Sequence, residues 1–248
     1  MNAADARRLL SLWDTQQSAY VAHREARFEA MLSVLELHAG DAPTVLDLAC
    51  GPGAISDRLL ATFPKATTIA VDFDPVLLAI ARGALDGRAR VHDLDLISDG
   101  WERQFGTERV DAVLTSTALH WLSPAQLLDV YTRVGRLLPA GGVLLNADHL
   151  RFDEQSPTLR AIAERHDTRT RQAGFASGAL DYDGWYEEAL RVPELAALGP
   201  ERERRFADRP PQPLAPLAFH LAALRAAGFA EAGTAWQYLD DYVVFARR

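Results

Sequence analysis

The chain of 248 residues has few cysteines and no long apolar run, two features that would indicate particular kinds of site or location. Its one cysteine, Cys50, can form no intramolecular disulfide and cannot build a thiol-based metal site alone. No run of eighteen apolar residues occurs, so no transmembrane helix is predicted, and the first residues lack the pattern of a secretory signal peptide. We therefore expect a cytoplasmic protein in a reducing compartment, with no membrane partner.

Positive charge is also scarce. There are 26 basic and 34 acidic residues, which gives a formal net charge of −8. A nucleic-acid-binding protein needs a basic face to displace counterions from phosphates, so this balance disfavours nucleic acid as a partner. The hydrophobic content of 48% and charged content of 24% are ordinary for a globular protein. The length suffices for one large α/β domain with small additions.

Strand and helix patterns alternate over much of the chain. Short apolar runs predict strands at 44–48, 67–71, 89–91, 110–114 and 143–147, with helical patterns between them. Strands that are apolar on both faces and separated by helices are typical of a parallel sheet covered by helices on both sides. The sequence therefore predicts an α/β fold.

The end of the chain predicts a different strand arrangement. Two further apolar runs, 232–239 and 242–246, are joined by so short a connection that they should form an antiparallel pair. Before them, residues 154–172 and 180–206 have helical patterns and no convincing strand, and a proline cluster, Pro210 to Pro216, closes this segment.

These patterns predict three parts. A core domain would comprise residues 41–149 and 214–248. Residues 1–40 would form a helical N-terminal cap, and residues 150–213 a helical insertion. In such sheets ligands bind at the carboxyl ends of the strands, so we expect the two additions to form a lid over that edge.

The most informative stretch is VLDLACGPG at residues 45–53. Small residues between a strand and a helix let a ligand approach the backbone closely. The dinucleotide fingerprint Gly-x-Gly-x-x-Gly is matched poorly, because Ala49, Gly51 and Ala54 stand at its glycine positions. Asp47, near the end of the strand, would repel a pyrophosphate and attract an ammonium group.

This stretch resembles the glycine-rich motif of class I S-adenosylmethionine (SAM)-dependent methyltransferases. The resemblance implies a Rossmann-like, seven-stranded, mostly parallel sheet with an antiparallel last strand. It also implies SAM as cofactor and S-adenosylhomocysteine (SAH) as product. Asp47 would then help to hold the methionine part of SAM, and the loop at Ala49, Gly51 and Gly53 would pack against the cofactor. Ala49 replaces the family's first glycine, and an ordinary strand–turn–helix loop is the alternative.

Further motifs follow in the family's order. Asp72, at the end of the second strand, can accept both ribose hydroxyls, although a carboxylate there could also cap a helix, a task that Asp74 fits better. Phe73 would pack on the adenine face or fill the core. The resemblance implies that Asp93 accepts from the adenine amino group with Leu94 nearby, the alternative for Asp93 being a turn carboxylate.

Two more segments are implied to face the methionine part of SAM. Thr115 and Ser116 leave the fourth strand there. In small-molecule members such as the trans-aconitate type, a helix with tyrosine and arginine covers the cofactor, which points to Tyr20 and to Arg24 or Arg27. Either arginine could bind the SAM carboxylate through two hydrogen bonds, and a solvated helix face explains them equally well.

Histidines are the candidate catalytic residues. His120 follows the fourth strand and His149 ends the fifth, so both should face the cleft. Each could act as a base or as a hydrogen-bonding group, or be satisfied locally. A base is needed only where the acceptor must lose a proton before attack.

Aromatic and basic side chains are the candidates for binding the acceptor. Aromatic rings attract a sulfonium through cation–π interaction but are also common core residues. The candidates are Trp13, Trp121, Trp185 and Tyr186. An anionic acceptor would suit the arginines of the insertion, Arg160, Arg165, Arg169 and Arg171. The charged run 201–205 indicates an exposed, salt-bridged helix instead, because Glu201 and Arg205 are four apart.

The sequence thus predicts a methyltransferase that acts on a small molecule, with no metal site. Asp93-x-Asp95 and Asp148-His149 have no spacing typical of metal ligands. Two alternatives keep the same cofactor motifs: an enzyme that cyclises or eliminates SAM, and a SAM-binding protein without catalysis. A nicotinamide-dependent dehydrogenase is the least favoured hypothesis. Neither the acceptor atom nor the oligomeric state follows from the sequence.

Overall fold

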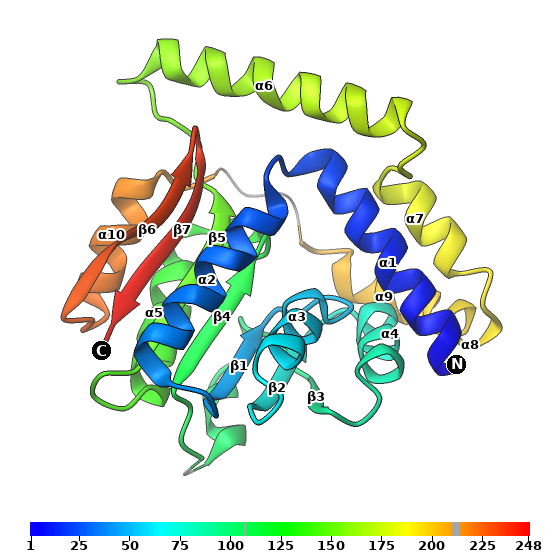
Figure 1. Ribbon diagram of the computed structural model, residues 1–248, viewed down its shortest axis with the longest axis horizontal. Coiled ribbons are helices and arrows are strands. Elements are labelled where there is room, and N and C mark those ends of the chain that lie inside the picture. Colours follow the sequence, from blue (N-terminus) through cyan, green and yellow to red (C-terminus); the bar gives the residue numbers. More distant parts are fainter. Residues whose placement is uncertain (107, 210–213) are drawn as a thin grey trace.

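A central seven-stranded sheet organises the molecule (Figure 1). The computed structural model describes residues 1–106, 108–209 and 214–248. The strand order is β3-β2-β1-β4-β5-β7-β6. The strands are β1 (Thr44–Leu48), β2 (Thr67–Asp72), β3 (Ala89–Asp93), β4 (Ala112–Ser116), β5 (Val143–His149), β6 (Glu231–Tyr238) and β7 (Asp241–Arg247).

The first five strands are parallel, and β7 pairs antiparallel with both β5 and β6. The Rossmann-like sheet expected from the sequence is therefore confirmed. The strand bounds differ slightly from the prediction: β3 extends to Asp93 and β4 begins at Ala112, so the site residues at their ends lie on or directly after regular strands.

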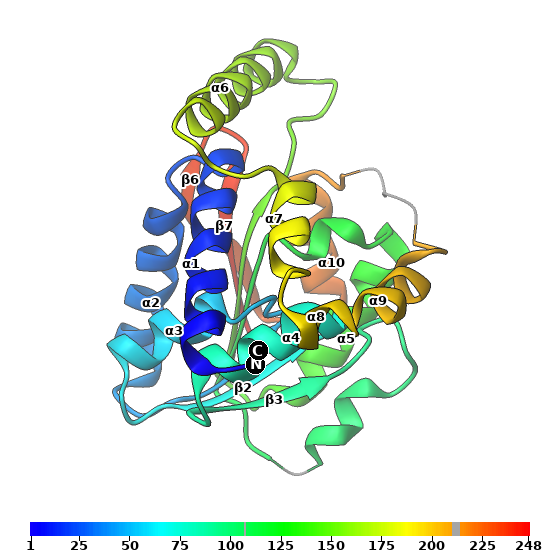
Figure 2. The ribbon, with the colours of Figure 1, turned by 90° about the vertical axis from the view of Figure 1, so that its right-hand side faces the viewer.

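Helices cover both faces of the sheet (Figures 1 and 2). One face packs against α2 (Arg24–Ala39), α3 (Ala54–Thr62) and α4 (Pro75–Leu85), and the other against α5 (Pro124–Leu137) and α10 (Leu217–Ala226). Side chains alternate along β1. Val45 packs in the hydrophobic core on the side of α2 and α3, and Leu46 and Leu48 pack in the core on the side of α5 and α10. This alternation turns Asp47 toward α3.

Local sequence explains where these helices begin. Asp74 caps α4 by accepting from the backbone N–H groups of Val76 and Leu77, with Pro75 as the first helical residue. Ser123 caps α5 in a capping box with Gln126. Both helices start at the carboxyl edge of the sheet, which fixes the loops that carry the candidate site residues.

Helices also lie outside the sheet domain, among the described residues before β1 and after β5. α1 (Ala3–Tyr20) precedes α2, and the insertion contains α6 (Pro157–Ala176), α7 (Tyr182–Ala189), α8 (Pro193–Ala196) and α9 (Gly199–Phe206). The predicted helical stretch at 180–206 is divided into three helices, because Pro193 is the first residue of α8 and Pro200 the second residue of α9. Two short 3₁₀ helices, Trp101–Phe105 and Leu119–Trp121, were not predicted.

α1 connects the insertion to the core domain. It packs against α4 on one side and against α6 and α7 on the other. Glycine allows the close crossing with α6, because a Cβ at Gly174 would lie 2.4 Å from Cβ of Ala19. Figure 2 shows α6 across the top of the molecule, beyond the carboxyl ends of the parallel strands.

Part of the predicted proline cluster, residues 210–213, lies outside the described residues. Within the described ranges, no helix combines the length and apolar character that crossing a bilayer requires.

Candidate active site

A cavity of about 760 Å³ lies at the carboxyl edge of the sheet. Its walls come from α1, from the loops that follow β1 to β4, from the end of β5 and from the insertion. The cavity is large enough for a nucleoside-sized ligand together with a small second molecule. It is the position at which open α/β sheets bind their ligands.

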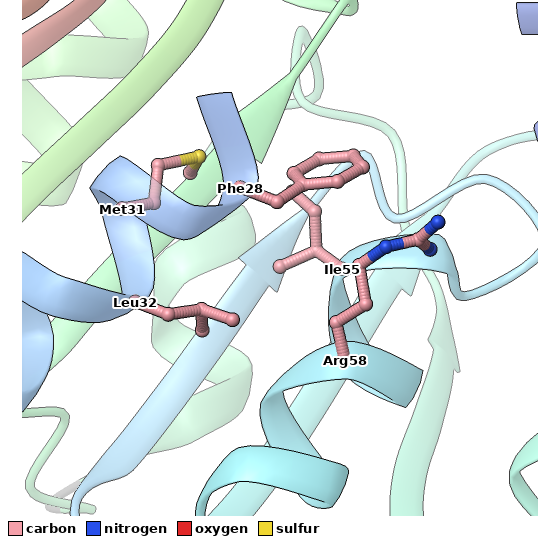
Figure 3. Close-up of a pocket in the computed structure, with 5 residues that line it drawn as sticks. All are labelled: Phe28, Met31, Leu32, Ile55 and Arg58. Atoms are coloured by element: carbon pink, nitrogen blue, oxygen red, sulfur yellow. The ribbon is translucent and has the colours of Figure 1, made fainter. Parts of the chain in front are cut away.

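A second hollow, between α2 and α3, is not a binding site. Figure 3 shows Phe28, Met31, Leu32, Ile55 and Arg58 around it. The guanidinium of Arg58 lies 4.8 Å from the centre of the Phe28 ring and closes the gap. These side chains join two helices, and we assign them to packing.

The glycine loop forms one wall of the cavity. Ala49, Cys50 and Gly51 line it, and Ala49 and Gly51 both have φ of 56°. The left-handed conformation at Ala49 explains why the family places glycine there. Gly53 has φ of 95° but does not line the cavity; a Cβ there would lie 3.1 Å from Leu85, so this glycine allows α3 to pack against α4.

Asp47 lies behind the loop rather than in the cavity wall. Its carboxylate is fully buried and accepts hydrogen bonds from the Ser56 backbone N–H (3.1 Å) and hydroxyl (2.7 Å). Burial raises the pKa of Asp47 to about 7, although the Ser56 hydrogen bonds oppose the rise. Oδ1 has no hydrogen-bond partner among the described residues. Asp47 is therefore not placed to contact a ligand in the cavity directly.

Asp72 lines the cavity and organises the loop beside it. Its carboxylate accepts from the backbone N–H groups of Gly51 (2.8 Å), Phe73 (2.7 Å) and Asp74 (2.8 Å). Burial raises its pKa to about 6 despite these hydrogen bonds. The structure thus joins the ends of β1 and β2 through one carboxylate.

Phe73 and Leu94 line the cavity as predicted, but Asp93 does not. The guanidinium of Arg205 binds both carboxylate oxygens of Asp93, at 2.7 and 2.8 Å. Asp95, two residues past the end of β3, lines the cavity instead.

The end of β4 divides its residues in the same way. Ser116 lines the cavity, whereas Thr115 is fully buried in the sheet, and its hydroxyl has no partner within the described residues. Thr117, which was not predicted, lines the cavity with φ of 52°.

The N-terminal helices contribute Tyr20 and Arg24 to the cavity, as predicted. Arg24 is nearly buried and donates to Asp14 at 2.6 Å. Desolvation lowers its pKa, against the attraction of Asp14. Arg27 is fully buried, forms an ion pair with Asp241 of β7 and does not line the cavity, so of the two arginines only Arg24 is in reach of a ligand.

His120 lines the cavity with a buried carboxylate behind it. Its Nδ1 donates to Oδ1 of Asp148 at 2.7 Å, and its backbone N–H donates to Oδ2 at 3.2 Å. Burial alone would lower the pKa of His120, but the charge and hydrogen bond of Asp148 outweigh it and raise the pKa. The pKa of Asp148 is correspondingly lowered, because His120 offsets the cost of burial.

His149 also lines the cavity, and its Nδ1 lies 2.5 Å from a carboxylate oxygen of Asp241. Nearby, His149, Asp167 and Asp240 place possible metal-ligand atoms within 4.8 Å of one another. The guanidinium of Arg151 binds both of these aspartates. Arg151 thus already supplies a positive charge to Asp167 and Asp240, and the cluster is better explained as an ion-pair network than as a metal site.

The four predicted aromatic residues separate into two pairs. Trp13 and Trp121 line the cavity, with Trp121 53% exposed. Trp185 is fully buried and donates from Nε1 to the Leu9 carbonyl, and Tyr186 donates to Asp74 at 2.8 Å. Neither lines the cavity, so the prediction for this pair was wrong: α7 uses them to pack against α1 and α4.

Several polar residues of the cavity were not predicted. Asp95, Thr117 and Arg151 follow β3, β4 and β5, whereas the packing of α1 and of the insertion brings the others to the carboxyl edge: Gln16, Asp167, Arg202 and Arg209. Of the insertion's four predicted arginines, Arg171 lines the cavity.

Known proteins are similar to this chain in sequence. The sequence model described as "Methyltransferase domain" matches residues 45–142. The trans-aconitate 2-methyltransferase of Methylobacterium nodulans is 30% identical over 190 residues, covering 71% of this chain and 68% of the relative. The same-named protein of Azoarcus sp. is 30% identical over 181 residues, covering 72% and 67%.

Solved structures agree on the fold. An O-methyltransferase family protein from Burkholderia thailandensis superposes with a TM-score of 0.56 at 19% identity, over 94% of this chain and 62% of that one. Human N-acetylserotonin methyltransferase in complex with SAM gives 0.54 at 16% identity, over 89% and 51%. The sheet, the glycine loop at its carboxyl edge and the sequence relatives lead to one conclusion: the chain belongs to the class I SAM-dependent methyltransferases.

Proposed function

We propose that this enzyme transfers the methyl group of SAM to a carboxylate oxygen of a small organic acid, giving a methyl ester. The observation that carries the proposal is the His120–Asp148 pair in the cavity wall. Asp148 favours the cationic imidazolium, which attracts an anion. Relatives named trans-aconitate 2-methyltransferase act, by their name, on such an acid.

Charged residues line the cavity at both ends. Asp72 lies at the end of β2 and has no ion pair with another described residue, whereas Arg209 pairs with Asp95 after β3. His120 and Arg171 line the part formed by the β4 loop and α6, where Arg151 pairs with Asp167. The carboxylate of Asp72 favours the adenosine at the β2–β3 end, and His120 and Arg171 favour an anionic acceptor at the other. Arg171 has no hydrogen bond or ion pair to another described residue, so its guanidinium is available to such an acceptor.

The polar groups around the cavity fit SAM. Nε2 of Gln16 and Nε of Arg24 are buried donors without partners among the described residues, and both residues line the cavity. They suit the carboxylate of the methionine part. Asp72 would hold the ribose hydroxyls, and Phe73 and Leu94 the adenine, while Ala49 and Gly51 let the cofactor approach the backbone.

When bound, SAM supplies a sulfonium methyl group that is open to in-line attack. A carboxylate attacks without losing a proton, so the chain need only orient it and exclude water. His120 and Arg171 would fix the carboxylate oxygens, and Tyr20 and Trp13 would close the cavity from α1. In this proposal residues 1–40 and 150–213 act as the lid over the core of residues 41–149 and 214–248.

An acceptor assay tests the proposal. The full chain is incubated with methyl-labelled SAM and trans-aconitate, or with phenol as an acceptor that lacks a carboxylate, and the products are identified by mass spectrometry. We expect SAH and a labelled methyl ester of trans-aconitate that mild alkali hydrolyses. Alkali-stable methylation of phenol alone would contradict the proposal and make His120 a base.

Arg171 offers a matched pair of variants. Arg171→Gln should raise the acceptor KM about tenfold and leave the KM for SAM unchanged, since one charged hydrogen bond contributes roughly 1.5 kcal/mol. Arg169→Gln, on the same helix but outside the cavity lining, is the control and should change neither constant.

A further inference from the structure

Three arginines of the insertion lie in α9 or just after it. Arg202 and Arg205 are three residues apart on α9, and Arg209 lies three residues past its last residue, Phe206. The sequence predicts an exposed, salt-bridged helix here, and the Glu201–Arg205 pair is indeed present at 2.8 Å. The structure adds that each arginine also reaches the core domain.

Each of the three binds a different aspartate at the carboxyl edge of the sheet. Arg202 donates to Asp74 at 2.7 Å, Arg205 binds Asp93 through two hydrogen bonds, and Arg209 pairs with Asp95. The aspartates follow β2 and end or follow β3. The insertion is therefore attached to these two neighbouring loops by three ion pairs.

Two of these arginines, Arg205 and Arg209, cover Phe73. The guanidinium of Arg209 lies 3.9 Å from the centre of its ring and that of Arg205 lies 5.1 Å away. Arg205 also donates to the Phe73 carbonyl at 2.8 Å. Stacked guanidinium and bound carboxylate together hold this loop under α9.

We propose that Arg205 and Arg209 form a latch over the adenosine end of the cavity, and that this latch must open for SAM to enter and for SAH to leave. The inference rests on the proposed placement of adenosine at Asp72, Phe73 and Leu94. Phe73, Asp95 and Arg209 all line the cavity, so the closed pairs join the insertion to the β2 and β3 loops in the cavity wall at this end.

The exposure of the latch suits a gate that responds to salt. Arg205 and Asp93 are 21% and 43% exposed, and Arg209 and Asp95 are 28% and 23% exposed, so dissolved salt can screen both ion pairs. Arg202 differs, because its partner Asp74 is buried and caps α4. Arg202 thus anchors the helix, while Arg205 and Arg209 can release it.

Stopped-flow tryptophan fluorescence measures the gate, since Trp13 and Trp121 line the cavity. SAH is mixed with the full chain and with the double variant Arg205→Gln/Arg209→Gln at 50 and 500 mM NaCl. The latch predicts that the variant binds and releases SAH at least fivefold faster than the wild type at low salt, with a Kd within threefold. High salt should accelerate the wild type toward the variant.

Arg204→Gln is the matched control, because Arg204 lies on the same helix, is 70% exposed and pairs with Glu201 of that helix. It should leave both rates unchanged.

Faster release with unchanged or slower association would overturn the latch and show that the arginines contact the cofactor directly. Equal rates in all variants would also overturn it. The single variant Arg209→Gln repeats the test if the double variant is unfolded by circular dichroism. No acceptor is present, so the outcome is independent of the proposed ester chemistry.

Discussion

Nδ1 of His120 donates a 2.7 Å hydrogen bond to the buried carboxylate of Asp148. The two residues come from different elements: His120 lies in the 3₁₀ helix that follows β4, and Asp148 is the next-to-last residue of β5. Because Asp148 takes Nδ1, Nε2 is the nitrogen left for a ligand, and the carboxylate favours the cationic ring. Because β4 and β5 are neighbours in the sheet, their ends bring His120 and Asp148 together, and the pair places a positively charged ring in the cavity wall.

This pair should make stability depend on pH. The pKa of His120 is raised above its ordinary 6.5 in the folded protein, so its protonation stabilises the fold fully below the unfolded value and this contribution is lost as pH rises through the folded value. We expect the wild type's advantage over His120→Gln in urea unfolding to shrink as pH increases above 6.5.

The comparison with a variant is needed because other groups act in the same direction. The pKa values of Asp47 and Asp72 are raised to about 7 and about 6, which also lowers stability as pH rises. Both are present in either protein, so they cancel in the difference. An advantage that is constant between pH 6 and 9 would exclude a raised His120 pKa, and Asp148→Asn should remove the pH dependence of the advantage.

Ala49 carries backbone strain that a glycine would relieve. Its φ of 56° costs an L-residue roughly 1–2 kcal/mol, and the greater flexibility of unfolded glycine returns about 0.4–1 kcal/mol of that. Ala49→Gly should therefore be neutral or stabilise the protein by up to about 1 kcal/mol in urea unfolding. Ala49→Val should destabilise it. A clear loss of stability in the glycine variant would show that the left-handed conformation is not strained.

Trp185 and Trp121 should respond in opposite ways to truncation. Trp185 is fully buried, so Trp185→Ala should cost about 3–5 kcal/mol of unfolding free energy. Trp121 is 53% exposed and lines the cavity, so Trp121→Ala should change stability little and raise the acceptor KM. Denaturant unfolding and steady-state kinetics of the two variants check this division, and comparable stability losses would contradict it.

The contrast between these tryptophans shows what a sequence can predict. The sequence shows that Trp185 is aromatic, but only the packing of α7 against α1 and α4 decides that it turns inward. Strand ends are more predictable, because parallel strands bring their carboxyl ends to one edge. Asp72, Ser116, His120 and His149 were predicted at the cavity for that reason, and they line it.

Ion-pair partners could not be predicted. Asp93 matches its family motif in sequence, yet Arg205, 112 residues later, takes both of its oxygens. Arg27 is likewise drawn away to Asp241, 214 residues later. Such pairs depend on how the insertion and the terminal hairpin are placed, and no local pattern encodes that placement.

Gly174 should matter for the position of α6. Alanine has the higher helix propensity, worth about 1 kcal/mol, but a Cβ here would lie 2.4 Å from Cβ of Ala19 in α1. Gly174→Ala should therefore lower stability or raise the acceptor KM by displacing α6. Ala173→Gly, at an exposed neighbouring position, should cost about 1 kcal/mol and leave the KM unchanged. A more stable Gly174→Ala variant with normal kinetics would mean that α6 does not pack closely on α1.

The pH dependence of kcat/KM for trans-aconitate tests the role of the His120–Asp148 pair most directly. If the cationic His120 binds the acceptor carboxylate, kcat/KM should fall as pH rises through the raised pKa of His120, and His120→Gln should lose this dependence. If kcat/KM instead rises over the same range, neutral His120 is acting as a base, the acceptor atom carries a proton, and the proposal of carboxylate methylation is wrong.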